Sequence, residues 1–234
     1  MNLFDLAFTC YVYGSFTTFN KSYKSFLKAT ANKVDLLNPE HREALIIWLN
    51  KWGCRQFSLE YHKMASGEIL SWCKEGHARL IPKDKKLWEL TETELRRISI
   101  IYDELAKKKA SKKMRGSNLL TITIGPTGAS KILFALRPEV AVPWDEAIRN
   151  GLKHMGDGDS YVKYLEQVRS EIESLSISCN KNGIEMFQVP QKLGRDEATI
   201  AQLIGEYLWV TETKKCYPPS LKTIQRLAKW SRDG

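Results

Sequence analysis

The segment RPEVAVPWDEAIRNGLKHMG, residues 137–156, joins the end of one expected helix to the start of another. A short apolar run ends at Pro143-Trp144, and a new helix should begin at Asp145. Apolar residues follow at helical spacing: Ile148, Leu152 and Met155. Asp145 heads that stripe and should point inward, where a carboxylate is costly unless it is hydrogen-bonded or used. It is therefore a helix cap, a functional group, or both.

Most of the remaining chain shows helical spacing of apolar residues. Thr91 precedes Glu92 and Glu94, which is typical of a capped helix start. A loop is expected between 176 and 194. The expected helices cover residues 39–53, 59–75, 91–105, 159–175, 195–210 and 219–231. Since no repeat or linker divides the chain, we predict a mainly α fold with a single domain of residues 1–234.

The composition is that of a globular protein, with 43% hydrophobic and 10% aromatic residues. No stretch approaches the ~20 apolar residues that span a bilayer, so no membrane partner is expected. The first residues, MNLFDLAFTCYVYGSF, lack a basic region and carry Asp5, which is unlike a signal peptide. We therefore expect a cytoplasmic location.

The five cysteines are scattered and never form a CxxC motif. In a cytosolic chain this pattern indicates reduced, buried thiols. The alternative is a zinc site built from Cys54, His62, Cys73 and His77, although their separations do not match a usual zinc knuckle. We expect neither a metal nor a cofactor.

The charge balance favours a polyanionic partner. Thirty-six Lys and Arg against 27 Asp and Glu give a net charge of +9 and a pI near 9.2. One run is especially basic: Lys107, Lys108, Lys109, Lys112, Lys113 and Arg115. It is either a solvated helix end, where cations suit the dipole, or a set of phosphate contacts.

A glycine-bearing turn follows this run, in SNLLTITIGPTGASKILFAL (117–136). Leu119 and Leu120 predict a short helix, and TIGPTG (123–128) predicts a tight turn. A second helix is expected from its apolar side: Ala129, Ile132, Leu133 and Leu136. Small residues at such a turn let backbone N–H groups approach a phosphate closely. The alternative is an ordinary helix–helix turn.

The turn, the helix and the aspartate together resemble the helix-hairpin-helix base-excision DNA glycosylases, closely over residues 118–153. In that family a hairpin grips the DNA backbone, and a short proline-containing segment leads to the essential aspartate. The matching segments are Gly125-Pro126-Thr127-Gly128-Ala129 and Val142-Pro143-Trp144-Asp145. The resemblance implies a helical bundle with a cleft between two subdomains, and a catalytic Asp145. It also implies a set of DNA contacts: Gly125, Thr127, Gly128, Lys131, Lys108, Lys109, Lys112, Lys113 and Arg115.

The chain departs from the family pattern at three points. Thr123 stands where the family hairpin usually has its first glycine, and Glu146-Ala147 follows the aspartate in place of the x-His often seen. Members that also cut the strand carry a lysine where this chain has Thr127, and Lys131 lies about one turn further on. We therefore expect a monofunctional glycosylase that works without a lysine nucleophile.

In the expected reaction Asp145 has a catalytic role. Cleavage of an N-glycosidic bond builds positive charge on the sugar, which a fixed carboxylate stabilises while it orients or deprotonates water. The base must flip out of the duplex, and Trp144 is the candidate to stack on it, unless it is a core residue. The aromatic N-terminus lines a pocket or belongs to the core: Tyr11, Tyr13, Phe16, Phe19, Tyr23 and Phe26.

We thus expect a monomeric enzyme that excises a modified or damaged base from double-stranded DNA, in repair or in defence against foreign modified DNA. The first alternative is a helix-hairpin-helix protein that binds DNA without chemistry. The second is an interaction protein with no nucleic-acid partner, for which the charge of +9 would be a coincidence.

Overall fold

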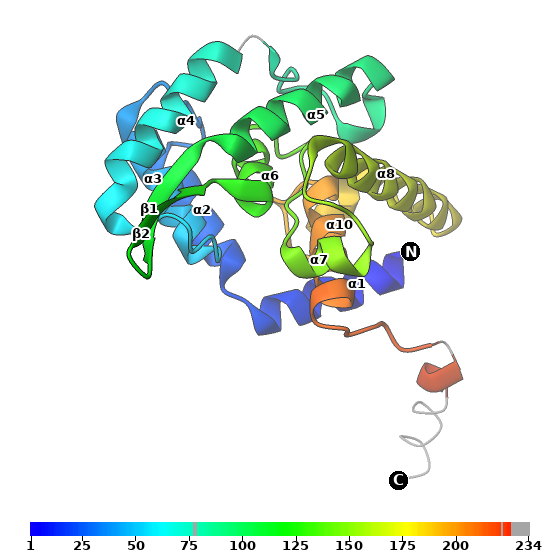
Figure 1. Ribbon diagram of the computed structural model, residues 1–234. Coiled ribbons are helices and arrows are strands. Elements are labelled where there is room, and N and C mark those ends of the chain that lie inside the picture. The colour runs from blue at the N-terminus through cyan, green and yellow to red at the C-terminus, as the bar shows by residue number, and fades with distance from the viewer. Residues whose placement is uncertain (77–78, 221, 226–234) are drawn as a thin grey trace.

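A computed structural model describes residues 1–76, 79–220 and 222–225, and its architecture is mainly helical, as predicted (Figure 1). The α-helices are α1 (Leu3–Phe16), α2 (Phe19–Ala29), α3 (Pro39–Lys51), α4 (His62–Gly76), α5 (Glu92–Lys107), α6 (Gly125–Leu136), α7 (Glu146–Gly151), α8 (Gly158–Lys181), α9 (Val189–Lys192) and α10 (Ile200–Leu208). Short 3-10 turns are η1 (Leu59–Tyr61), η3 (Leu87–Glu89) and η4 (Met186–Gln188), and the π-helical turn η5 (Trp209–Thr213) continues α10.

Local signals explain where several helices begin. Thr91 caps α5 by accepting a hydrogen bond from the backbone N–H of Glu94, whose side chain accepts from the N–H of Thr91. Pro39 opens α3, and Gly53 follows its end with a φ of +85°, a left-handed conformation that favours glycine. The predicted helices at 39–53 and 91–105 are confirmed.

A two-stranded antiparallel ribbon separates α5 from α6 (Figure 1). It consists of β1 (Lys109–Arg115) and β2 (Asn118–Thr123). The predicted short helix at Leu119 and Leu120 is therefore wrong. Most of the basic run lies on β1, after the end of α5. The physical reason is the run Thr121-Ile122-Thr123, because β-branched residues favour extended backbone and here they pair with the lysine-rich strand.

Other boundaries differ from the prediction. The helix that starts after Asp145 is short, because α7 ends at Gly151 and Lys153 turns the chain with a φ of +58°. Met155 is consequently exposed and does not continue the inward stripe. The predicted loop at 176–194 is only partly correct, since α8 extends to Lys181 and η4 and α9 occupy Met186–Lys192, with turns between and after them. Much of the helix predicted at 219–231 lies outside the described residues.

The N-terminal helix packs against helices from the C-terminal half of the chain. The N-terminal helix α1 crosses below α7 and α10 and contacts α8, α10 and η5 (Figure 1). Helices α2 to α6 and the ribbon form the other side of the molecule, joined to the first by the contact of α5 with α8. One large hydrophobic core runs through both sides. This arrangement brings residues from both ends of the chain to the segment around Asp145.

Candidate active site

Asp145 lies at the N-terminus of α7 with its carboxylate held by two donors. Oδ1 accepts the backbone N–H of Ile148 at 2.8 Å, which makes Asp145 the helix N-cap. The hydroxyl of Thr213, from η5, lies 3.2 Å from both Oδ1 and Oδ2. The side chain is half-buried and lines a cavity. The capping role is therefore confirmed, and the geometry leaves Asp145 available for chemistry as well.

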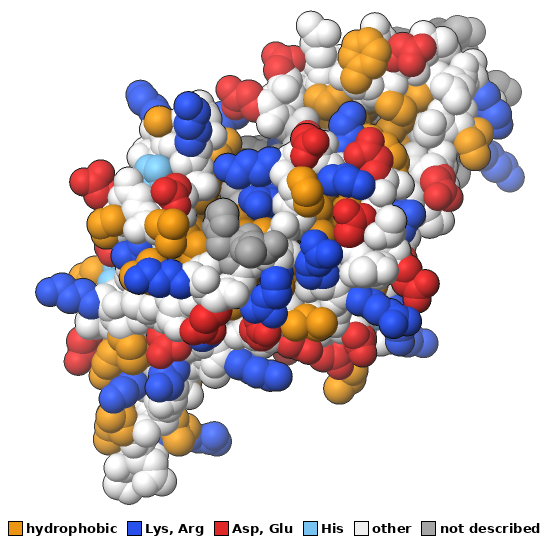
Figure 2. Space-filling view, turned by 90° about the horizontal axis from the view of Figure 1, so that it is seen from above, with side chains coloured by type: hydrophobic (Ala, Val, Ile, Leu, Met, Phe, Trp, Pro, Cys, Tyr) orange, Lys and Arg blue, Asp and Glu red, His pale blue; other side chains and the backbone are white. Residues whose placement is uncertain are grey.

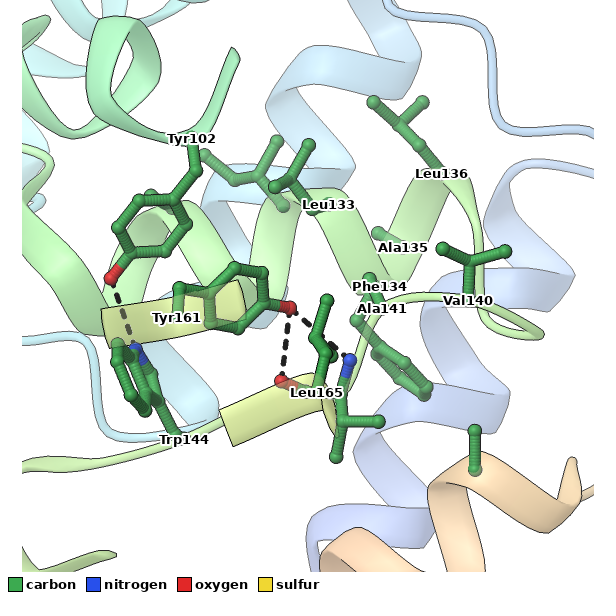
Figure 3. Packing of buried hydrophobic residues seen from close by; sticks show 14 of the residues in the cluster. Tyr102, Leu133, Phe134, Ala135, Leu136, Val140, Ala141, Trp144, Tyr161 and Leu165 are labelled. Atoms are coloured by element: carbon green, nitrogen blue, oxygen red, sulfur yellow. Dashed lines mark hydrogen bonds between the residues drawn. The ribbon is translucent and has the colours of Figure 1, made fainter. Parts of the chain in front are cut away.

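Tyrosines fix the segment that leads to Asp145 (Figure 3). The Tyr161 hydroxyl accepts the Val142 N–H at 3.2 Å and donates to the Val142 carbonyl at 3.1 Å. The Tyr164 hydroxyl donates to the Pro143 carbonyl at 3.2 Å. Burial raises the pKa of both phenols, and the Asp145 charge contributes to the rise at Tyr164. Both hydroxyls therefore stay protonated, and the backbone before Asp145 keeps one conformation.

Trp144 also holds in place the segment that leads to Asp145. Its indole N–H donates to the Tyr102 hydroxyl at 3.0 Å (Figure 3), and its ring stacks on Tyr164 with centroids 5.2 Å apart. The guanidinium of Arg149 lies 5.6 Å from the ring centroid. Trp144 is only 1% exposed although it forms part of the cavity wall. These contacts make it a core residue that anchors the aspartate segment.

The cavity beside Asp145 has a volume of about 520 Å³ and lies between the two sides of the molecule. Its wall combines aromatic with polar side chains, which is the usual character of a small-molecule site. The lining residues come from segments far apart in the sequence: Tyr13, Phe19, Trp52, Gly53, Arg55, Gln56, Thr127, Lys131, Pro143, Trp144, Asp145, Glu146, Ile148, Gln202, Gly205, Glu206, Trp209 and Thr213.

Three of the aromatic rings that line the cavity lie together. Phe19 meets both Trp52 and Trp209 edge-on, with ring centroids 6.0 and 6.1 Å apart. Lys131 lies against this wall: its ammonium group donates to the Trp52 carbonyl and sits 5.2 Å from the Trp52 ring centroid. Lys131 is therefore a cavity residue, largely buried, and not an external phosphate contact.

Glu206, another residue of the wall, is held by an ion pair with Arg195. Arg195 donates to both carboxylate oxygens of Glu206, at 2.6 and 2.7 Å, and Glu206 is 4% exposed. The Gln202 amide nitrogen also donates to Glu206, at 3.1 Å, and to Asn20 at 3.4 Å. These bonds use the amide hydrogens of Gln202, and no donor among the described residues reaches its carbonyl oxygen.

The residues predicted to form a phosphate-binding hairpin form the first turn of α6. The ribbon feeds directly into that turn, so a strand–helix junction replaces the expected helix–hairpin–helix. Gly125 has a φ of +67°, which favours glycine. At Gly128 a Cβ atom would lie 2.8 Å from Gln56 Nε2 and 2.8 Å from Ile124 Cγ2, so packing requires this glycine. Thr127 lines the cavity and accepts a hydrogen bond from Arg149 at 3.0 Å.

The basic run divides into two parts. Lys108 and Lys109 lie at the base of the ribbon and face α4, where their ammonium groups lie 3.3 Å from Glu75 and 3.9 Å from Glu68. Lys112, Lys113 and Arg115 are exposed on the ribbon, which forms the narrow projection at the lower left of Figure 2. Lys107, in the last turn of α5, is exposed as well, and the described acidic side chains leave it and the second part unpaired.

Sequence reasoning missed several cavity residues. Trp209 and Thr213 are brought in by the π-helical turn, which no local pattern announces. Trp52, Gly53 and Arg55 belong to the sequence WGCR (52–55), which predicts a helix end near the cleft but indicates no role. The aromatic side chains of the N-terminal segment lie in three environments. Tyr13 and Phe19 line the cavity, Tyr23 and Phe26 belong to the core, and Tyr11 and Phe16 are exposed.

The cysteines agree with the reduced state expected of them. Cys10, Cys54, Cys73 and Cys179 are buried free thiols, and burial raises the pKa of each. Within the described ranges, no three His, Cys, Asp or Glu side chains come together as metal ligands. His77, part of the zinc alternative, lies outside them. None of the described helices has the length and apolar character needed to cross a bilayer.

Comparison with protein-family models, curated proteins and solved structures gave no match for this chain.

Proposed function

We propose that this protein is a monofunctional DNA glycosylase that hydrolyses the N-glycosidic bond of a flipped-out, modified or damaged base. The observation that carries the proposal is the position of Asp145. Its carboxylate is fixed by Ile148 and Thr213 and lines an aromatic-walled cavity. A carboxylate held in one place beside an aromatic-walled pocket large enough for a base is the arrangement that this reaction requires.

In the proposed reaction the C1′–N bond breaks and its electron pair leaves with the base. The positive charge that develops on the sugar is stabilised by Asp145, which needs no rearrangement because two donors already hold it. A water molecule oriented by the same carboxylate adds its oxygen to C1′. The proton released by the water ends on the departing base, and an abasic site remains in the strand.

The flipped base is proposed to stack against Phe19, Trp52 and Trp209, and not against the buried Trp144. The Gln202 carbonyl and the Lys131 ammonium group supply an acceptor and donors for the edge of the base. The duplex is attracted by the net charge of +9 and by a stretch without Asp or Glu between Glu104 and Glu139.

The proposal is tested with Asp145→Asn on duplexes that each carry one modified or damaged base. Asparagine caps helices nearly as well as aspartate, so the variant should fold and bind DNA like the parent. Without the carboxylate charge, base release should fall on the order of a hundredfold or more. Abasic sites are revealed by strand cleavage with heat or alkali.

Glu146→Gln is the matched control, because it removes one negative charge from the neighbouring residue, which also lines the cavity. It should leave excision within a few-fold of the parent. Equal excision by Asp145→Asn and the parent would make Asp145 a cap only. If the parent binds DNA but releases no base from any duplex, the glycosylase proposal fails and the protein is a non-catalytic DNA-binding protein.

A further inference from the structure

The ribbon of β1 and β2 projects from the helical body, and its outer part is exposed to solvent. Every residue from 112 to 121 is exposed, and we call this part the ribbon tip. Its base is anchored on α4: Ala110 and Ser111 are buried there, and Lys109 approaches Glu68. Figure 1 shows the two strands leaving the helical body as an isolated pair, and such a pair alone is only marginally stable in water.

The ribbon tip combines exposed apolar side chains with cations. Met114, Leu119 and Leu120 are 57%, 53% and 42% exposed. Lys112, Lys113 and Arg115 flank Met114 on β1 and lie across from Leu119 and Leu120 on β2, and the tip contains no acidic residue. The end of the projection in Figure 2 accordingly shows orange, blue and white surfaces. Exposed apolar groups interleaved with cations indicate a surface that binds a partner of negative charge.

The strand register places both kinds of side chain on both faces of the ribbon. Directly paired residues share a face, and the next pair along lies on the opposite face. One face carries the pairs Met114–Leu119 and Lys112–Thr121, and the other carries Arg115–Asn118 and Lys113–Leu120. A membrane or a flat protein surface would be met by one face only. A groove with two charged walls meets both faces.

We propose that the ribbon tip lies in the major groove of double-stranded DNA. That groove is about 12 Å wide and admits a two-stranded β-ribbon. Lys112 on one face, and Lys113 and Arg115 on the other, would reach phosphates on its two walls. Met114 and Leu119 on the first face, and Leu120 on the second, would contact base edges, thymine methyl groups among them, at the foot of each wall.

The position of the contact relative to the cavity follows from the length of the strands and rests on the proposed glycosylase function. Ile124, at the ribbon base, accepts a hydrogen bond from Gln56, which lines the cavity. Six residues of strand at about 3.3 Å each put the ribbon end roughly 20 Å from this point. At about 3.4 Å per base pair, a ribbon that runs along the duplex axis contacts the duplex up to roughly six base pairs from the flipped nucleotide.

Dimethyl sulfate footprinting tests the proposal, because the reagent methylates guanine N7 in the major groove and adenine N3 in the minor groove. The probe is a duplex that carries one tetrahydrofuran abasic-site analogue. The full-length protein should protect guanine N7 up to roughly six base pairs to one side of the analogue. Lys112→Ser/Lys113→Ser should lose this protection and lower the salt dependence of binding (the slope of log K against log salt) by about two.

Lys163→Ser/Lys181→Ser is the matched control, since both lysines are exposed on α8, on the other side of the molecule from the ribbon (Figure 1). It should keep the protection and the slope of the parent. The proposal is overturned if the ribbon variant protects N7 like the parent, or if protection near the ribbon is confined to adenine N3. It is also overturned if the variant binds DNA normally but no longer sediments with anionic lipid vesicles.

The same samples separate this proposal from the proposed function. Ribbon-dependent protection of N7 on an unmodified duplex, with no base released by the parent, would support the ribbon and refute the glycosylase. Excision that depends on Asp145, with N7 protection unchanged in the ribbon variant, would support the glycosylase and refute the ribbon proposal.

Discussion

The hydroxyl of Thr213 lies 3.2 Å from each carboxylate oxygen of Asp145. This contact connects the C-terminal part of the cavity wall to the proposed catalytic carboxylate. Thr213 belongs to η5, a π-helical turn, and no other side chain in the described residues donates to this carboxylate. The backbone N–H of Ile148 holds one oxygen along the axis of α7, and Thr213 holds the carboxylate from the side.

Thr213→Val should therefore lower kcat for base excision while leaving KM within a few-fold. A hydrogen bond to a charged group contributes about 1.5–3 kcal/mol, so a decrease on the order of tenfold or more is expected. Thr213→Ser restores the hydroxyl and should restore most of the rate. A Thr213→Ser variant as slow as Thr213→Val would show that the methyl group, and not the hydrogen bond, matters.

Lys131 should not form a covalent intermediate with DNA. Its ammonium group is engaged by the carbonyl and ring of Trp52. Borohydride added during excision should trap no protein–DNA adduct, because the trap requires a Schiff base between an amine and C1′. An adduct that disappears in Lys131→Met would instead make Lys131 the nucleophile and the enzyme bifunctional.

Gly128→Ala should destabilise the fold by about 1–3 kcal/mol. The added methyl group overlaps Gln56 Nε2 and Ile124 Cγ2, and displacing Gln56 breaks its 2.6 Å hydrogen bond to the Ile124 carbonyl. Gly67→Ala in α4 is the control, since open space surrounds that position and alanine favours helix by roughly 0.5–1 kcal/mol. Urea denaturation of both variants should give changes of opposite sign.

Asp157 should make the stability of α8 depend on pH. Its carboxylate caps α8 by accepting the Ser160 N–H at 2.8 Å, and this bond, with the Ser160 hydroxyl, lowers the pKa of Asp157 below its ordinary value. A lowered folded-state pKa means that the stabilisation is present above the unfolded pKa of about 3.9 and is lost as pH falls through the folded value.

Asp157→Ala should thus cost about 1 kcal/mol at pH 7, with the gap to the parent closing in acid below about pH 4. Glu173→Ala, an exposed change in the middle of the same helix, should show no comparable gap at either pH. A gap for Asp157→Ala that is constant with pH would mean that the charge plays no part in the cap.

Features set by local chemistry were predictable from the sequence. The Thr91 cap, the Pro39 start of α3 and the inward position of Asp145 each depend on residues within one helical turn. The same holds for Ile148, which is buried as its spacing predicted. Short-range steric and hydrogen-bond preferences fix such features before any tertiary contact forms.

The ribbon and the cavity wall were not predictable in this way. Lysine-rich strands show no apolar alternation, so β1 resembles a solvated helix end until its partner strand is known. Trp52 and Lys131 meet where α3 contacts α6, and Trp209 reaches the same wall through Phe19, far from it in the sequence. Such long-range pairing depends on the whole packing of the chain and leaves no short sequence signature.

The π-helical turn at Trp209–Thr213 makes the length of this segment as important as its composition. A π turn holds more residues than an α-helical turn, and it often arises where one residue has been inserted into a helix. Deleting one residue between Trp209 and Thr213 would restore ordinary helical spacing and rotate Thr213 by roughly 100° about the helix axis. The indole of Trp209 would keep its place while the hydroxyl turned away from Asp145. A single-codon deletion here would thus disconnect the aromatic wall from the carboxylate without changing either group.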